Sequence, residues 1–97
     1  MTLDDLTPAK RNKIKEIAAQ HGAFNIRVFG SVAKGKADPN SDLDLLVDYD
    51  IDKISPWFPV RLIRDLENFL GIKVDVVTPE GLKTRIRDEV LQESLVL

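Results

Sequence analysis

Residues 30–44 read GSVAKGKADPNSDLD, in which ten residues separate a Gly-Ser pair from an Asp-x-Asp pair. Apolar, β-favouring runs flank this stretch at Phe24–Phe29 and Leu43–Val47, and each predicts a short strand. Side chains alternate across a strand, so Asp42 and Asp44 would project from one face with their Cα atoms about 6.6 Å apart. Both carboxylates can therefore reach one cation.

Helix and strand signals continue on both sides of this stretch. Thr7-Pro8 is typical of a helix start and Gly22 of a helix end, which predicts a first helix over about residues 8–21. The residues Ala37–Asn40 predict a turn. The later elements are a helix on Leu62, Leu66, Phe69 and Leu70 closed by Gly71, a strand over Ile72–Thr78, and a helix on Leu82, Ile86 and Val90. Leu95–Leu97 fits either a short closing strand or a frayed tail.

The order helix, strand, short helix, strand, helix, strand, helix predicts an α+β fold with helices packed against one sheet. A chain of 97 residues has the usual size of one domain, so we expect a single domain over residues 1–97. This size leaves no room for separate nucleotide and substrate domains.

Composition excludes several classes of protein. Fourteen basic and sixteen acidic residues give a net charge of −2, too balanced for a module that holds nucleic-acid polymers by neutralising phosphates. No long apolar run and no signal peptide is present, so we expect a cytoplasmic protein without a membrane partner. The chain has no cysteine and one histidine, His21, which excludes thiol chemistry and a Ser/His/Asp triad. Acidic side chains must hold any metal.

A third acid and the Gly-Ser pair complete a candidate site. Asp75 interrupts the apolar run at residues 74–77, and a neighbouring strand can bring it beside the first two aspartates. Oxygen-only ligands suit Mg²⁺ or Mn²⁺, and Mg²⁺ often takes further ligands from nucleotide phosphates. A glycine at Gly30 lets the backbone approach a phosphate, and a helix starting at Ser31 would direct N–H groups and a hydroxyl toward it.

These residues together resemble the signature of the polymerase-β-type nucleotidyltransferase superfamily. The Gly-Ser-x-Ala-x-Gly form of Gly30–Gly35, the run Ser41–Leu45 and the run Val74–Pro79 are similar to its minimal nucleotidyltransferases. The resemblance spans at least residues 24–82 and implies a small mixed sheet with helices packed against it.

The resemblance also implies roles for individual residues. Asp42 and Asp44 would bridge two Mg²⁺ ions, and Asp75 would bind the ion that activates the attacking hydroxyl and is a candidate base. Gly30 and Ser31 would hold the β- and γ-phosphates of ATP. Lys34 stands where many relatives carry arginine and keeps the charge without the bidentate fork. The implied nucleotide-binding set is Gly30, Ser31, Lys34 and Ser41.

Members of this kind commonly accompany HEPN-domain proteins as antitoxins, and some transfer AMP from ATP to a tyrosine of that toxin. The resemblance therefore implies a Mg²⁺-dependent adenylyltransferase in a hetero-oligomer with a HEPN toxin. The alternative is a binding module that neutralises the toxin by occlusion, with a vestigial metal site. A 97-residue chain offers little surface for a nucleobase pocket, so partner atoms can complete the site. Transfer to a small hydroxylated compound is a third reading, but such relatives carry an additional domain.

Other motifs have simpler interpretations. Residues 30–36 nearly spell a Walker A loop, but Ala37 lacks the hydroxyl that would bind Mg²⁺. Asp48, Asp50 and Asp52 alternate, yet the residues that follow do not fit an EF-hand, so we expect a solvated loop. His21 is expected to cap its helix. The aromatic pair Trp57-Phe58 can stack an adenine, meet a partner or anchor the core, and the sequence leaves these open.

Overall fold

A computed structural model describes residues 1–97, and in it helix α1 (Pro8–Gln20) begins and ends where the sequence predicts. The Thr7 side chain accepts a hydrogen bond from the Lys10 N–H at 3.3 Å, and this satisfies one of the free amides of the first turn. His21 is the C-cap, as expected, and Gly22 follows with φ +80°, which favours glycine. Local sequence therefore fixes both ends of α1.

The centre of the molecule is a four-stranded mixed sheet in the order β3-β2-β1-β4. Its strands are β1 (Ala23–Phe29), β2 (Leu43–Tyr49), β3 (Val74–Val77) and β4 (Leu95–Val96). β1 pairs antiparallel with both β2 and β4, whereas β2 and β3 are parallel. The expected mixed sheet is confirmed. At the C-terminus, where the sequence fitted either a strand or a frayed tail, Leu95–Val96 form a short strand.

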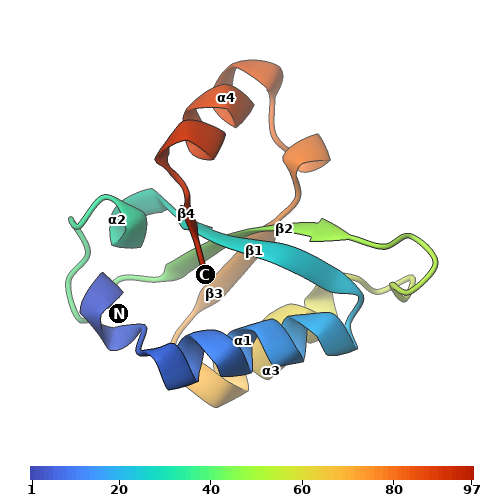
Figure 1. Ribbon diagram of the computed structural model, residues 1–97, viewed down its shortest axis with the longest axis horizontal. Helices are drawn as coiled ribbons and strands as arrows, with labels where there is room; N and C mark the ends of the chain where they lie inside the picture. The colour runs from blue at the N-terminus through green and yellow to red at the C-terminus, as the bar shows by residue number, and fades with distance from the viewer.

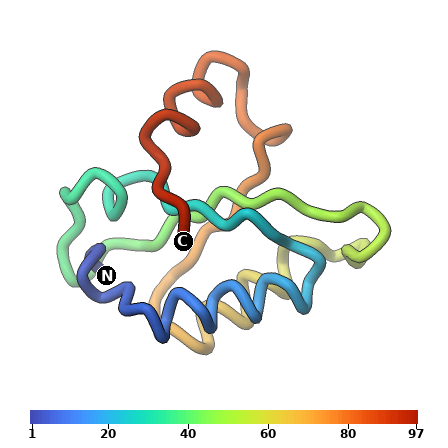
Figure 2. The backbone as a smooth tube through the Cα atoms, viewed as in Figure 1, coloured from blue at the N-terminus to red at the C-terminus, as the bar shows by residue number.

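Helices lie on both sides of the sheet (Figures 1 and 2). The remaining helical elements are η1 (Leu3–Asp5), α2 (Gly30–Ala33), α3 (Val60–Leu70), η2 (Pro79–Gly81) and α4 (Thr84–Glu93). α1 and α3 run side by side beneath one face, and α4 stands on the opposite side (Figure 1). The α+β class is confirmed. None of the helices is both long and apolar enough to span a bilayer.

The hydrophobic core fills the space between the sheet and the pair α1 and α3. Alternate residues of β2 and β3 face these helices, and Leu43, Leu45 and Val74 are among the buried ones. Facing them are apolar residues of the helices, and the fully buried examples are Ile14, Leu62 and Leu66. The other face of β2 carries polar side chains, so burial of the core directs these toward the side of α4.

Some details differ from the sequence predictions. The third strand covers Val74–Val77, shorter than the predicted Ile72–Thr78, and the last helix begins at Thr84, so Leu82 lies before it. Asp48 is part of β2 rather than of a solvated loop. For the aromatic pair, which the sequence left open, Phe58 packs against the core while Trp57 is 64% exposed.

Candidate functional site

Asp44 of β2 and Asp75 of β3 are direct partners in the parallel ladder. Paired residues on adjacent strands share a face of the sheet, and neighbouring residues Leu43 and Val74 are buried on the opposite face. Both aspartates therefore lie on the face away from α1 and α3. The structure brings the third acid beside the second, as the interrupted apolar run predicted.

Asp42 completes this acidic cluster, which we define as Asp42, Asp44 and Asp75. It lies two residues before Asp44, just ahead of β2, and is exposed. Burial raises the pKa of the half-buried Asp44 carboxyl, and the negative charges of Asp75 and Asp42 raise it further. The three carboxylates are thus within electrostatic reach of one another. As they stand, no three acidic or histidine side chains enclose a single point where an ion would sit.

Gly30 lies directly against this cluster. The preceding residue, Phe29, pairs with Asp44 across the β1–β2 ladder, and α2 begins at Gly30. A Cβ atom placed on Gly30 would collide with the Asp44 carboxylate oxygen Oδ2, and the φ of Gly30 is +72°. Glycine is therefore required here for two reasons, the backbone conformation and the space that it leaves beside Asp44.

The other three predicted nucleotide-binding residues differ in their surroundings. Ser31 follows Gly30 in α2 and is half-buried. Lys34 forms an ion pair with Glu93 of α4, with Nζ and Oε2 3.2 Å apart. Ser41 closes a turn, because its hydroxyl accepts a hydrogen bond from the Asp38 N–H at 3.0 Å. Ser31 is therefore close to the acidic cluster, because it follows Gly30 in the chain. The side chains of Lys34 and Ser41 instead bond to other residues of this chain.

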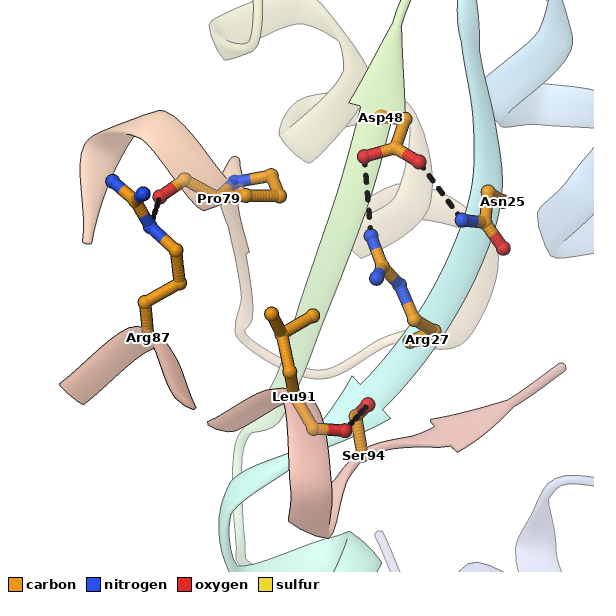
Figure 3. Close-up of polar contacts among 7 residues, drawn as sticks. All are labelled: Asn25, Arg27, Asp48, Pro79, Arg87, Leu91 and Ser94. Carbon is orange, nitrogen blue, oxygen red and sulfur yellow. Dashed lines mark hydrogen bonds and ion pairs between the residues drawn. The ribbon is translucent and has the colours of Figure 1, made fainter. Parts of the chain in front are cut away.

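A polar network that the sequence analysis missed lies on the same face of the sheet (Figure 3). Asp48 accepts hydrogen bonds from Asn25 Nδ2 at 2.8 Å and from Arg27 Nη2 at 3.2 Å. Asn25 adopts φ +52° where the β1–β2 register shifts, which turns its side chain toward Asp48. The Arg27 side chain is only 12% exposed, and its Nε atom has no partner. The signal available in the sequence was the two-residue spacing of Asp44, Leu46 and Asp48.

A second arginine, Arg87, connects helix α4 to the segment that precedes it. Arg87 of α4 donates from Nε to the Pro79 carbonyl at 2.7 Å (Figure 3). It also donates from Nη2 to the Leu82 carbonyl at 3.2 Å. These bonds join α4 to η2. Near the end of α4, the Ser94 hydroxyl donates to the Leu91 carbonyl at 3.0 Å (Figure 3). The Ser94 bond therefore closes the last turn of α4, and Arg87 joins the helix to η2.

The chemistry of the acidic cluster fits a divalent cation. All its donors are carboxylate oxygens, the ligands that Mg²⁺ and Mn²⁺ prefer. Their mutual repulsion, which adds to burial in raising the pKa of Asp44, is the interaction that a cation reverses. The absence of a Cβ at Gly30 leaves room for the Asp44 carboxylate itself. Asp42 and Asp75 are exposed, so a substrate can reach the cluster from solvent.

Comparison with known proteins gives consistent results. A family model described as a nucleotidyltransferase domain matches residues 11–97. The protein adenylyltransferase MntA of Thermococcus cleftensis is 35% identical over 94 residues, which cover 96% of this chain and 93% of the relative. A solved structure assigned as a minimal nucleotidyltransferase has a TM-score of 0.84 and 43% identity, and the match covers 100% of this chain and 97% of that one.

A second solved structure, a toxin–antitoxin complex with AMP-PNP, has a TM-score of 0.74 and 25% identity to this chain. The match covers 89% of this chain and 70% of that one. The family model spans most of the chain, and it includes the Gly-Ser pair and all three aspartates. The chain therefore belongs to the nucleotidyltransferase domain family and is an enzyme of that class.

Proposed function

We propose that this nucleotidyltransferase transfers AMP from ATP to a tyrosine hydroxyl of a cognate HEPN-domain toxin and so acts as its antitoxin. The observation that carries the proposal is the pairing of Asp44 with Asp75 beside Asp42 on one open face of the sheet. The similarity to a protein adenylyltransferase and to a toxin–antitoxin complex supports the choice of acceptor and nucleotide. The proposed setting is the cytoplasm, in a hetero-oligomer with the toxin.

In this proposal the acidic cluster would hold Mg²⁺, with Asp42 and Asp44 as ligands that two ions would share and Asp75 as a ligand that one would use. When bound, the ions would offset negative charge on the phosphates and favour the deprotonated acceptor hydroxyl. Gly30 and Ser31 would face the β- and γ-phosphates of ATP, because Gly30 lies against Asp44 and a backbone without a Cβ atom can approach a phosphate closely. Lys34 can join them once it leaves Glu93.

The reaction is an in-line displacement at the α-phosphorus. The tyrosine oxygen forms a bond to the α-phosphorus, the bond from that phosphorus to the bridging oxygen of pyrophosphate breaks, and pyrophosphate leaves. Asp75 would accept the phenol proton, and its exposure and its pairing with Asp44 support this role. Tyrosine has an ordinary pKa of about 10, so the attack at neutral pH depends on removing this proton.

The direct test incubates the protein with ATP labelled at the α-phosphate, Mg²⁺ and the product of the neighbouring gene. Wild type is expected to label that partner, and Asp42→Asn and Asp44→Asn are expected to lose at least 100-fold in rate, about 2.7 kcal/mol. Asp52→Asn is the matched control, because it removes a carboxylate from an exposed turn away from the cluster. Equal labelling by all four proteins would show that the metal-site assignment is wrong.

The second candidate function is neutralisation by occlusion. The observation that favours it is that the acidic cluster does not enclose an ion by itself. In the same experiment, a stable complex between the two proteins with no transferred label would support occlusion over catalysis. Binding and labelling together would support the adenylyltransferase.

A further inference from the structure

Lys34 and Glu93 form an ion pair between α2, which begins with the Gly-Ser pair, and the last residue of α4. Their Nζ and Oε2 atoms are 3.2 Å apart, and the two side chains are 46% and 49% exposed. The two helices are in contact with each other. The ion pair therefore connects an element of the proposed nucleotide site to a helix that carries none of the site residues.

The pairing of β1 with β4 brings the end of α4 close to Gly30. Val28 of β1 pairs with Leu95 of β4, and the two strands are antiparallel. Gly30 follows Val28 by two residues. Glu93 precedes Leu95 by two residues, so it falls at the same end of this strand pair as Gly30. Strand register thus places the Glu93 carboxylate beside the segment where the phosphates are proposed to bind.

Lys34 lies one helical turn after Gly30. The Lys34 N–H donates to the Gly30 carbonyl at 3.1 Å, which is the bond between residues i+4 and i of an α-helix. Side chains four residues apart share one face of a helix and lean toward its N-terminal end. The lysine stem is also long and flexible. The Lys34 ammonium can therefore reach either the Glu93 carboxylate or a phosphate that approaches the backbone at Gly30.

The Glu93 side chain can leave Lys34 without disturbing the core. Helices α1, α2 and α3 each contribute buried residues, whereas α4 contributes none. Two apolar side chains of α4, Ile86 and Leu91, are themselves 46% and 38% exposed. Because the ion pair is half exposed as well, breaking it uncovers no packed apolar surface.

We propose that Glu93 is a positioning residue that lowers the affinity of the site for ATP, because it holds Lys34 in an ion pair that the triphosphate must break. This inference rests on the proposed binding of the β- and γ-phosphates at Gly30 and Ser31. Carboxylate and phosphate oxygens both accept charge-assisted hydrogen bonds from an ammonium group, so they compete for Lys34. An exposed ion pair is weak, and its competition should therefore reduce ATP affinity by about 2- to 5-fold.

The competition also acts in the opposite direction. If release of Glu93 favours the nucleotide, bound nucleotide favours release of Glu93 by the same factor. ATP would then detach the last turn of α4 from α2, while the pairing of β4 with β1 is unaffected. The empty and occupied sites would thus differ in how firmly the end of α4 is held.

Two other roles of Glu93 are chemically reasonable. Its negative charge can repel the phosphates directly, without acting through Lys34, or the ion pair can serve only to hold α4 in place. Competition is favoured over a purely structural role because half-exposed ion pairs contribute little to stability. It is favoured over direct repulsion because the Glu93 charge is already paired with an ammonium 3.2 Å away.

The first test measures the Kd for ATP with Mg²⁺ by calorimetry, on the whole chain and without the neighbouring gene's product, so that no transfer to it takes place. Glu93→Gln should lower this Kd about 2- to 5-fold. Lys34→Met should raise it, and adding Glu93→Gln to Lys34→Met should cause no further change. AMP lacks the β- and γ-phosphates, so its Kd should be the same for all of these proteins.

Glu89→Gln is the matched control for this measurement. Glu89 lies one turn before Glu93 in α4, has the same charge and is exposed. This variant should bind ATP as wild type does. An equal fall in Kd for Glu89→Gln and Glu93→Gln would overturn the inference, because it would show a general effect of negative charge. A fall caused by Glu93→Gln that persists in Lys34→Met would overturn it in favour of direct repulsion.

The second test follows the side-chain carboxylate carbon of Glu93 by NMR. Its chemical shift in free wild type should differ from that in Lys34→Met, which cannot form the ion pair. Saturating ATP with Mg²⁺ should move the wild-type signal toward its position in Lys34→Met, and AMP should not. A signal that stays in place at saturating ATP would show that the ion pair survives nucleotide binding, which would overturn the inference.

The outcomes separate this inference from the proposed function. If wild type binds no ATP, the proposed nucleotide is wrong. If wild type binds ATP with the same Kd as Glu93→Gln, only the role of Glu93 is wrong. Both measurements omit the acceptor, so they do not depend on whether label is transferred to it. Should Glu93→Gln fail to fold, the NMR shift of Glu93 in wild type decides.

Discussion

Gly30 faces Asp44 so closely that a Cβ atom at Gly30 would first meet the Asp44 Oδ2 atom. Gly35 has nearly the same backbone angle, φ +69° against +72°, but a Cβ atom there would meet nothing within 4 Å. Substitutions at both positions would strain the backbone, but only one at Gly30 would also displace a carboxylate. Comparing the two therefore distinguishes these effects.

We expect Gly30→Ala to abolish AMP transfer and Gly35→Ala to retain most of it. Both substitutions place an L-residue at positive φ, which costs about 1 to 2 kcal/mol. Only the first pushes the Asp44 carboxylate away from its position beside Asp75. Melting temperatures should therefore fall for both variants, and initial rates of label transfer should fall much further for Gly30→Ala. Equal rates for the two variants would contradict the role of Gly30.

Asp44 should make the protein less stable as the pH rises. The ordinary pKa of an aspartate is 3.8, and burial, Asp75 and Asp42 raise the pKa of Asp44 above it. The folded state then holds this proton more tightly than the unfolded state, so the stabilisation is complete below pH 3.8 and is lost as the pH rises through the raised pKa. Asp44→Asn should have a higher free energy of unfolding than wild type at pH 7.

Urea denaturation across a pH series without divalent cations measures this difference. The advantage of Asp44→Asn should shrink as the pH falls toward 3.8. Asp52→Asn is the control for removal of an exposed carboxylate. An Asp44→Asn variant that is less stable than wild type at pH 7 would mean that the carboxylate is stabilised by contacts in the fold.

Magnesium should raise the melting temperature if the acidic cluster binds it. A ligand that binds only the folded state at 100 times its Kd adds about 2.7 kcal/mol of stability. We expect this shift for wild type and Asp52→Asn, and no shift for Asp42→Asn or Asp44→Asn. Thermal denaturation over a Mg²⁺ titration, at constant ionic strength, gives the measurement. A shift of the same size in every variant would place the ion elsewhere.

Two ion pairs of different burial should differ in their effect on stability. Asp48→Ala leaves the nearly buried Arg27 without its acceptor, and we expect a loss of about 1 to 3 kcal/mol. Glu93→Ala breaks the pair with Lys34, whose side chains are 46% and 49% exposed, and we expect a change within about 0.5 kcal/mol. Chemical denaturation compares them. A larger loss for Glu93→Ala would show that α4 depends on its contact with Lys34.

Local signals predicted the parts of the fold that depend on nearby residues. The cap at Thr7 is confirmed, and the end of α3 at Gly71, which adopts φ +70°, is also where the sequence placed it. The run around Asp75 predicted a charged side chain in a strand, because the valines on both sides favour a strand and an aspartate among them is rarely buried. The roles of the predicted site residues stay predictions until the variants are measured.

The features that the sequence analysis did not predict depend on contacts between residues far apart in the chain. Asp48 alternates with Asp44 as a strand requires, but an acid near a strand end has the same pattern as a loop until its partner Arg27 is known. The bulge at Asn25 follows from the register of β1 against β2, which no local signal specifies. The strand order and the pairing of Lys34 with Glu93 likewise depend on where α4 returns to the sheet.

The parallel contact between β2 and β3 also links the site to the folding pathway. Parallel neighbours need a crossover connection, and here α3 supplies it between Leu43–Tyr49 and Val74–Val77. Two of the three oxygen donors therefore meet only after a long loop has closed, a step that slows folding. Cation affinity thus reports tertiary assembly: a collapsed intermediate with helices formed but the crossover undocked would bind the ion no better than an unfolded chain.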